Sequence, residues 1–373
     1  MVSIARKNLA HDKRRFIITV IGISASLLLI FFGLGMNFGT INSMLSITDH
    51  SQADIWVVNE GVESLLDEPS YINESLITEI SNIEGVKSVH SLIYTNIMLA
   101  KNDTRLASIL VGTDFTANII EPWKLLSGND DGLIQEEDVI IVDEIATRNF
   151  NEISVGDTFK INNFNQEIIG ISKGARSFIY PFVLTSLENA KKIARMGNTT
   201  NYLLVETNTN HPSEQVKNEI NKIAGLEALL QKEIRKNTIL YMQFEAGMGL
   251  GTFLFAIVGL FVAIVIIALT TYTSTMERIP DFATLKAIGA SQWDIRKILL
   301  EMISWGVILG YILGLITSLL GALLINSVTL MPVYIPVALA VGTFFVTYFL
   351  SLLSGFIPMR VIKKIDPAIV FRR

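Results

Sequence analysis

The chain has 373 residues, a mean hydropathy of +0.46 and a formal net charge of −5, and half of its residues are hydrophobic. This composition excludes an ordinary soluble domain, and the lack of cysteine excludes disulfides, thiolate nucleophiles and cysteine-bound metals. Residues 37–240 hold 28 of the 35 acidic residues, whereas 14 of the 30 basic residues flank apolar runs, so we expect a membrane part and a polar domain.

The chain opens with a basic, amphipathic segment, residues 1–15, followed by an apolar run at 16–36. About 20 helical residues cross the roughly 30 Å of hydrocarbon in a bilayer, so residues 16–36 are predicted to be transmembrane helix 1. The run is too long for the apolar region of a signal peptide, and GMNFGTINS after it lacks an A-x-A cleavage site. We therefore expect an uncleaved anchor.

Residues 37–245 predict an α+β extracytoplasmic domain inserted between the first two membrane helices. A strand at 54–58, a helix at 74–83 and the strand VKSVHSL give the order β-α-β. A similar unit begins at 202–206, and its helix EQVKNEINKIAGL aligns with ESLITEISNIEGV of the first. The alignment predicts two related β-α-β halves packed on one another.

Short strand-like segments separated by polar turns lie between these halves and predict a β-rich subdomain. They are 106–114, 138–146, 157–161, 166–172 and 182–186. The sequence has no phosphate-binding glycine loop and no H-E-x-x-H motif, and its four histidines are isolated. We therefore predict no catalytic residue and no metal site, and interpret acidic pairs such as Asp130-Asp131 as solvated loop charge.

Three further apolar runs, 246–272, 301–326 and 333–357, predict transmembrane helices 2 to 4. Lysine and arginine gather before helix 1, between helices 2 and 3, and after helix 4, whereas the short connection between helices 3 and 4 has none. Because cytoplasmic loops carry the excess of Lys and Arg, both termini, the segment 273–300 and the tail 358–373 are predicted to be cytoplasmic in the cell (inner or plasma) membrane.

The predicted membrane helices carry almost no charged residues, which argues against an ion-coupled transporter because such proteins keep ionisable groups near mid-membrane. Helix 3 instead has a small residue at every fourth position. Small residues at this spacing let a second helix approach closely. The predicted helix-packing residues are Gly306, Gly310, Gly314 and Ser318, continued by Ala322.

The segment 273–300 predicts a short helix rather than a plain loop. Pro280 and Asp281 suit the first turn of a helix, and Phe282, Leu285 and Ile288 are expected on one face. Such a helix either rests on lipid or docks on a protein partner.

A turn and a second helix are predicted directly after it. Gly289 ends the first helix, and Ser291 with Asp294 has the spacing of a capping box for a helix that continues into the third span. Two helices joined in this way would transmit motion, which a flexible loop would absorb.

The stretch PDFATLKAIGAS resembles the coupling-helix signature of MacB/FtsX-type permeases of ABC transporters. The opening ARKNLAHDKRRFIITVIGIS and the ending IPMRVIKKIDPAIVFRR resemble the ends of the same family, and the order of one span, a large outer domain and three spans matches its architecture. The size of the outer domain favours the MacB, DevC-like or HrtB-like branches.

The resemblance implies a porter-like outer domain, a permease homodimer and a separate cytoplasmic ABC ATPase dimer, which would bind ATP and Mg. The chain itself would then be no enzyme and hold no cofactor. In the family the corresponding residues dock on the ATPase, with Lys286 as a surface contact, Leu285 and Ile288 as wedges and Gly289-Ala290 as the turn. The implied ATPase-coupling residues are Pro280, Asp281, Phe282, Leu285, Lys286, Ile288, Gly289, Ala290 and Ser291.

The family resemblance implies the membrane subunit of an ATP-driven export complex that works by mechanotransmission. The alternative is a signalling permease that relays the state of the ATPase to an outer partner without moving cargo. Further partners would be membrane lipids and a membrane-fusion protein, and no nucleic acid is expected. HrtB-like members export haem, so haem would be a cargo, and lipid, lipopeptide, peptide and drug remain open. Candidate substrate residues are Met36, Met242, Glu245 and Met248, with packing as the alternative role.

Overall fold

The computed structural model describes residues 13–66, 69–130, 137–150, 153–277, 279–356 and 359–360. Nearly all of the predicted N-terminal segment and C-terminal tail, together with Arg278, therefore lie outside the described residues. The chain divides into two compact units. We call Met1–Gly39, Gly249–Thr329 and Val333–Arg373 the membrane unit, and Thr40–Met248 with Leu330–Pro332 the outer unit.

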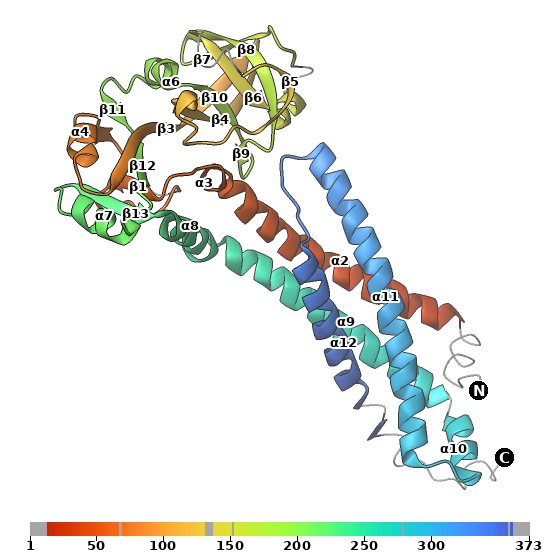
Figure 1. Cartoon of the computed structure of the whole chain (residues 1–373). Helices are drawn as coiled ribbons and strands as arrows, with labels where there is room; N and C mark the ends of the chain where they lie inside the picture. The colour runs from red at the N-terminus through yellow and green to blue at the C-terminus, as the bar shows by residue number, and fades with distance from the viewer. Residues whose placement is uncertain are drawn as a thin grey trace. The chain divides into compact units, whose positions relative to one another are not determined.

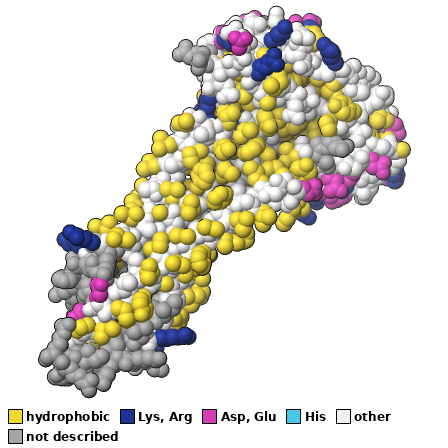
Figure 2. Space-filling model, turned by 180° about the vertical axis from the view of Figure 1, so that it is seen from behind, with side chains coloured by type: hydrophobic (Ala, Val, Ile, Leu, Met, Phe, Trp, Pro, Cys, Tyr) yellow, Lys and Arg dark blue, Asp and Glu magenta, His cyan; other side chains and the backbone are white. Residues whose placement is uncertain are grey.

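Long apolar helices build the membrane unit (Figure 1). They are α2 (Lys13–Met44), α9 (Met248–Glu277), α11 (Gln292–Val328) and α12 (Val337–Ser354), with the short α10 (Ile279–Ala287) between α9 and α11. In the described part of the chain, these four long helices are the ones long and apolar enough to cross a membrane. Figure 2 shows hydrophobic side chains covering their surface, as expected for helices that face lipid.

The membrane helices differ in extent from their predicted bounds. The first continues to Met44 rather than ending at residue 36. The predicted boundary at 300–301 falls inside α11, which is one continuous helix from Gln292. Their shared core contains Ile23, Leu27 and Phe31 of α2 among other buried side chains.

Polar contacts also join α11 to α12. The hydroxyls of Ser304 and Tyr348 lie 3.0 Å apart, and the Tyr311 hydroxyl donates to the carbonyl of Ala340. Such hydrogen bonds hold helices together in a medium where the hydrophobic effect no longer does so.

The outer unit is a mixed α/β domain. Its strands are β1 (Ile55–Asn59), β2 (Ile72–Asn73), β3 (Val86–Lys101), β4 (Thr104–Thr113), β5 (Lys124–Gly128), β6 (Val139–Asp143), β7 (Thr158–Ile161), β8 (Phe164–Lys173), β9 (Arg176–Ser177), β10 (Tyr180–Ser186), β11 (Thr199–Thr200), β12 (Tyr202–Thr207) and β13 (Leu226–Leu230). Its helices are α3 (Ser46–Asp49), α4 (Leu76–Ser81), α6 (Leu187–Ala194), α7 (Ser213–Ile220) and α8 (Gln231–Leu240), with the 3₁₀ turns η1 (Phe115–Ala117) and η2 (Glu144–Arg148) and the π turn η3 (Tyr241–Glu245).

The two β-α-β units share one sheet. Strand order in the described residues is β13-β1-β12-β3-β4-β10-β6-β8-β5, so β12 lies between the strands of the first unit and β1 between those of the second. Ile80 of α4 and Ile220 of α7 are fully buried in the same core, against Val57 and Leu203 of the sheet. The two helices and their strands therefore interleave, which corrects the expectation of two halves packed on one another.

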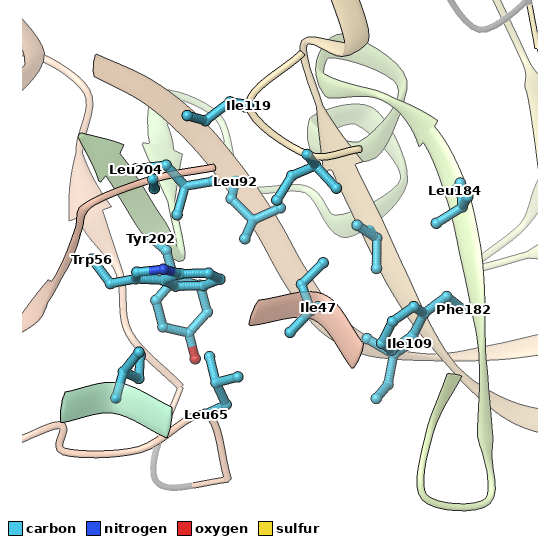
Figure 3. Packing of buried hydrophobic residues seen from close by; sticks show 14 of the residues in the cluster. Ile47, Trp56, Leu65, Leu92, Ile109, Ile119, Phe182, Leu184, Tyr202 and Leu204 are labelled. Atoms are coloured by element: carbon cyan, nitrogen blue, oxygen red, sulfur yellow. The ribbon is translucent and has the colours of Figure 1, made fainter. Parts of the chain in front are cut away.

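The predicted β-rich subdomain is continuous with this sheet, because the long strand β3 pairs with both β12 and β4. It also contains α6, which the sequence analysis did not predict. This helix packs closely on β4, because a Cβ added at Gly112 of β4 would lie 2.0 Å from the Cβ of Ala190 of α6. Between the two regions lies a core that includes Trp56, Tyr202 and Phe182 (Figure 3). The main sheet of the outer unit is therefore continuous and has two helix-covered regions, while β2 and β11 pair separately.

Candidate functional site

The predicted cytoplasmic segment forms a rigid turn between α10 and α11, which we call the elbow (residues 279–299). The N–H of Ala290 donates to the carbonyl of Leu285 over 2.9 Å, and that of Gly289 donates to Lys286 over 3.0 Å. This pair of bonds is a Schellman motif, which requires a left-handed residue, and Gly289 has φ +95°. Glycine takes this conformation without steric cost, so α10 ends where the sequence predicts.

The second helix begins two residues after this turn. Ser291 Oγ accepts from the N–H of Asp294 over 3.2 Å, and Asp294 Oδ2 accepts from the N–H of Ser291 over 3.0 Å. This reciprocal pair confirms the capping box that the spacing predicts. Only the four residues from Ile288 to Ser291 separate the end of α10 from the start of α11, so little free chain remains to bend.

A small hydrophobic core fixes the angle of the elbow. Phe282 and Ala283 of α10 are buried against Ile295 and Leu299 of α11, and Leu285 is half-buried beside them. Phe282 is 1% exposed, although it lies on a nine-residue helix at the end of the unit. The short helix is therefore held by packing, since nine residues alone form an unstable helix in water.

The structure separates the three apolar residues that the sequence placed on one face. Phe282 and Leu285 point into the elbow core, whereas Ile288 is 76% exposed. Ile288 directly precedes the left-handed glycine, beyond the last residue of α10, so the face of the helix no longer governs its direction. The wedge role predicted for Leu285 and Ile288 stays a prediction, with Ile288 as the accessible member.

Trp293 is a second exposed apolar residue of the elbow, which sequence reasoning missed. Its side chain is 64% exposed, and the Arg296 guanidinium lies 5.9 Å from its ring centroid. The signal was a large aromatic residue in the first turn of a capped helix, two positions after the cap. Of the remaining predicted residues, Pro280, Asp281 and Ser291 are exposed and Lys286 and Ala290 are half-buried.

The small-residue stripe of α11 faces α2. A Cβ added to Gly310 would lie 2.8 Å from Cβ of Ile23, and one added to Gly314 would lie 2.9 Å from Cβ of Leu27. Gly306, Ser318 and Ala322 are buried as well. The glycines thus allow the two helices to approach to a distance that side chains would prevent.

The candidate substrate residues belong to different units, so their grouping stays a prediction. Met36 lies half-buried in α2 within the membrane unit. In the outer unit, Met242 is 7% exposed within η3, Glu245 is exposed at its end, and Met248 is half-buried at the start of α9.

Titratable side chains in the described part of the chain do not gather into a metal-binding group. Among the described residues no three His, Asp or Glu side chains are placed to hold one ion. His50 stacks on Trp123 with ring centroids 4.4 Å apart, and His211 lies 3.4 Å from Glu84. Asp138 pairs with Lys192 over 2.9 Å, and hydrogen bonding to that lysine holds the pKa of Asp138 below its usual value. His11 and Asp131 lie outside the described residues.

Comparison with known proteins assigns a family to both units. A model of the MacB-like periplasmic core domain matches residues 16–223, and a model of the FtsX-like permease C-terminal domain matches residues 253–367. The putative hemin transport system permease protein HrtB of Staphylococcus haemolyticus (strain JCSC1435) is 24% identical over 318 residues, which cover 83% of this chain and 82% of that protein.

Two solved structures are similar to about half of the chain. The periplasmic region of MacB from Actinobacillus actinomycetemcomitans is 14% identical with a TM-score of 0.39, and the match covers 52% of this chain and 94% of that one. The extracellular domain of the noncanonic ABC-type transporter YknZ from Gram-positive bacteria is 15% identical with a TM-score of 0.37, and the match covers 47% and 98% of the two chains.

The two family models confirm the resemblance that the sequence motifs indicate, and with the four apolar helices they identify a membrane protein with an extracellular domain. The chain belongs to the family of ABC-transporter-type permeases that join a MacB-like periplasmic core domain to an FtsX-like permease domain.

Proposed function

We propose that this chain is the permease subunit of an ATP-driven export complex that works by mechanotransmission. A homodimer of the chain would hold the outer domains outside and both termini inside the cell membrane. A separate cytoplasmic ABC ATPase dimer would bind ATP and Mg and dock on the elbow. Movements of the ATPase would then pass through the elbow and the membrane helices to the outer domain, where a membrane-fusion protein would be a further partner.

The construction of the elbow is the observation that supports this proposal. Its two helices are fixed by a Schellman motif, a capping box and their own core, yet Ile288 and Trp293 stay exposed at the turn. A segment that only rested on lipid would not need such stiffness, whereas a lever must not bend under load. Exposed aromatic and apolar side chains with a nearby arginine are typical anchors of protein interfaces.

The docking role can be tested with Ile288→Asp in this chain, co-expressed with the partner ABC ATPase. A charge at an exposed anchor should reduce co-purification of the ATPase by about tenfold, equivalent to roughly 1.4 kcal/mol. Leu285→Asp should weaken assembly too, but it also places a charge in the elbow core, so Ile288→Asp is the cleaner variant.

Val155→Asp serves as the matched control, because Val155 is an exposed apolar residue of the outer unit. The control should retain the ATPase at the wild-type level. Wild-type recovery of the ATPase with Ile288→Asp and Trp293→Asp together would refute docking at the elbow.

Haem is the first cargo to test, because the relative from Staphylococcus haemolyticus is described as a putative hemin transport permease. We propose Met36, Met242, Glu245 and Met248 as its contacts. In the reconstituted complex, hemin should stimulate ATP hydrolysis and move across the membrane. Hydrolysis that responds to an outer protein partner, with no cargo moved, would instead indicate a signalling permease.

A further inference from the structure

A pocket of about 200 Å³ opens in the outer unit, beside the core drawn in Figure 3. It is lined by side chains from separate strands, among them Tyr94 of β3, Ile109 of β4 and Tyr202 of β12. Ser177 at the end of β9 and Phe178 in the turn before β10 close another side. None of the functions considered above uses this pocket.

The pocket has an apolar floor and a more polar mouth. Ile109 and Tyr202 are 5% and 4% exposed at the floor, whereas Asn96 and Tyr180 are exposed at the mouth. Phe178 has φ +53°, a backbone conformation that is rare for a bulky residue. The surrounding structure must therefore stabilise this conformation, which keeps Phe178 beside the pocket. The site is therefore concave, aromatic and reachable from solvent.

The hydroxyl of Tyr94 supplies an unused polar group. It is buried and has no partner at full hydrogen-bond geometry in the described part of the chain, and its polar neighbour is the Ser177 side chain, which lowers the pKa of Tyr94 against the larger effect of burial. Edge contacts to Phe182 and Tyr202, with ring centroids 5.8 and 6.3 Å away, hold the Tyr94 ring in place. Buried polar groups are nearly always hydrogen-bonded, and a phenolic hydroxyl can both donate and accept, so this hydroxyl beside a pocket has room for a partner other than Ser177. Burial also raises the pKa of Tyr94 to about 12, so the group stays a neutral hydroxyl.

The size of the pocket limits what it can hold. An engineered cavity of about 150 Å³ binds benzene, whereas sites for drug-sized ligands have about 300–1,000 Å³. A porphyrin is far larger than one ring and does not fit. The described residues that line the pocket include no charged side chain, which disfavours an ionic ligand because a buried charge needs a partner.

We propose that this pocket binds a neutral ligand with a single aromatic ring and a hydroxyl group, which hydrogen-bonds to the hydroxyl of Tyr94. The ring would pack between Tyr202, Ile109 and Phe178. The ligand class is that of simple phenols. The site lies within the outer unit and is independent of the elbow and of the haem contacts proposed above.

The test uses photolabelling of the full-length protein in lipid nanodiscs. One probe is a phenol that carries a photoactivated diazirine, and the other is the same molecule without the hydroxyl. Labelled peptides are mapped by mass spectrometry with and without excess phenol. Tyr94→Phe removes only the hydroxyl, Thr95→Trp fills the mouth, and Tyr71→Phe is the matched control at an exposed tyrosine outside the pocket.

The phenolic probe should label peptides that contain Tyr94, Ile109 or Phe178 saturably, and excess phenol should compete. Tyr94→Phe should weaken this labelling by roughly two- to tenfold, the range of one hydrogen bond, and leave labelling by the second probe unchanged. Thr95→Trp should abolish both, and Tyr71→Phe should change neither. Unsaturable labelling confined to the lipid-facing helices, or pocket labelling that is insensitive to both Tyr94→Phe and Thr95→Trp, would overturn the proposal.

Discussion

A buried carboxyl group lies at the end of β6, where Asp143 is 1% exposed. Its Oδ1 accepts from the N–H of Ile145 over 3.0 Å, and its Oδ2 accepts from the N–H of Ala175 over 2.8 Å. Burial raises the pKa of Asp143 to about 6, against the opposing effect of these donors and of Arg176. The carboxyl group thus ties η2 to the segment before β9.

The pKa of Asp143 predicts how the stability of the outer unit depends on pH. The folded-state pKa of about 6 exceeds the ordinary value of 3.8, so the folded state binds the proton more tightly. The stabilisation of the folded state by protonated Asp143 is complete below about pH 4 and is lost as the pH rises through 6. About two pKa units correspond to roughly 3 kcal/mol. We expect the melting temperature, followed by tryptophan fluorescence, to fall between pH 4.5 and 7.

Asp143→Asn should remove this part of the pH dependence while changing the absolute stability, since an amide accepts through one atom only. Asp138→Asn is the control, because pairing with Lys192 lowers the pKa of Asp138. Titration of Asp138 therefore changes the stability only below about pH 4. If Asp143→Asn and wild-type melt with the same slope between pH 4.5 and 7, the assignment to Asp143 is wrong.

Single residues of the elbow show where sequence reasoning succeeds and where it stops. Gly289 and the pair Ser291 and Asp294 were predictable because caps depend on residues within five positions of one another. The burial of Leu285 and the exposure of Ile288 could not be predicted, because both depend on where α11 packs against α10. The Tyr94 pocket was also hidden, since its walls come from separate segments of the chain between Met44 and Tyr202.

Elements in the outer unit show the same division. The helices α4 and α7 carry local apolar patterns and end before Gly85 and Gly225, which both have positive φ. Their equivalence was therefore visible in the alignment. The interleaving of their strands was not visible in the sequence. Pairing β1 with β12 joins residues about 150 positions apart, and no local pattern specifies which strand pairs with which.

The contact between α2 and α11 yields a prediction about Gly310. In Gly310→Leu the new side chain must occupy space held by Ile23, whose Cβ would lie 2.8 Å from the added Cβ. The helices would have to separate, at a cost of about 1–3 kcal/mol. We expect a melting temperature several degrees lower than that of the wild-type protein in detergent.

Gly321→Leu is the matched control in the same helix, because a Cβ added at Gly321 meets nothing within 4 Å. This variant should melt close to the wild-type temperature. Equal melting of both leucine variants would show that the stripe is not a packing surface.

For the molecule as a whole, mechanotransmission requires that the elbow be stiff as well as bound. Two glycines inserted between Ala290 and Ser291 would separate the Schellman motif from the capping box and leave both helices, with Ile288 and Trp293, unchanged in sequence. A docked but flexible joint should still recruit the ATPase and permit basal hydrolysis. It should lose most cargo transport, because each stroke would bend the joint instead of moving α11.

The measurement compares ATPase co-purification, hydrolysis and hemin transport in the reconstituted complex, with the same insertion at the exposed turn of Gly61 as the control. The control should behave as wild-type in all three. Transport at the wild-type rate through the glycine-extended elbow would mean that force does not travel through this joint. Loss of ATPase binding would show that the turn itself is part of the interface, and the rigid geometry of Gly289 to Ser291 would then act in docking rather than in transmission.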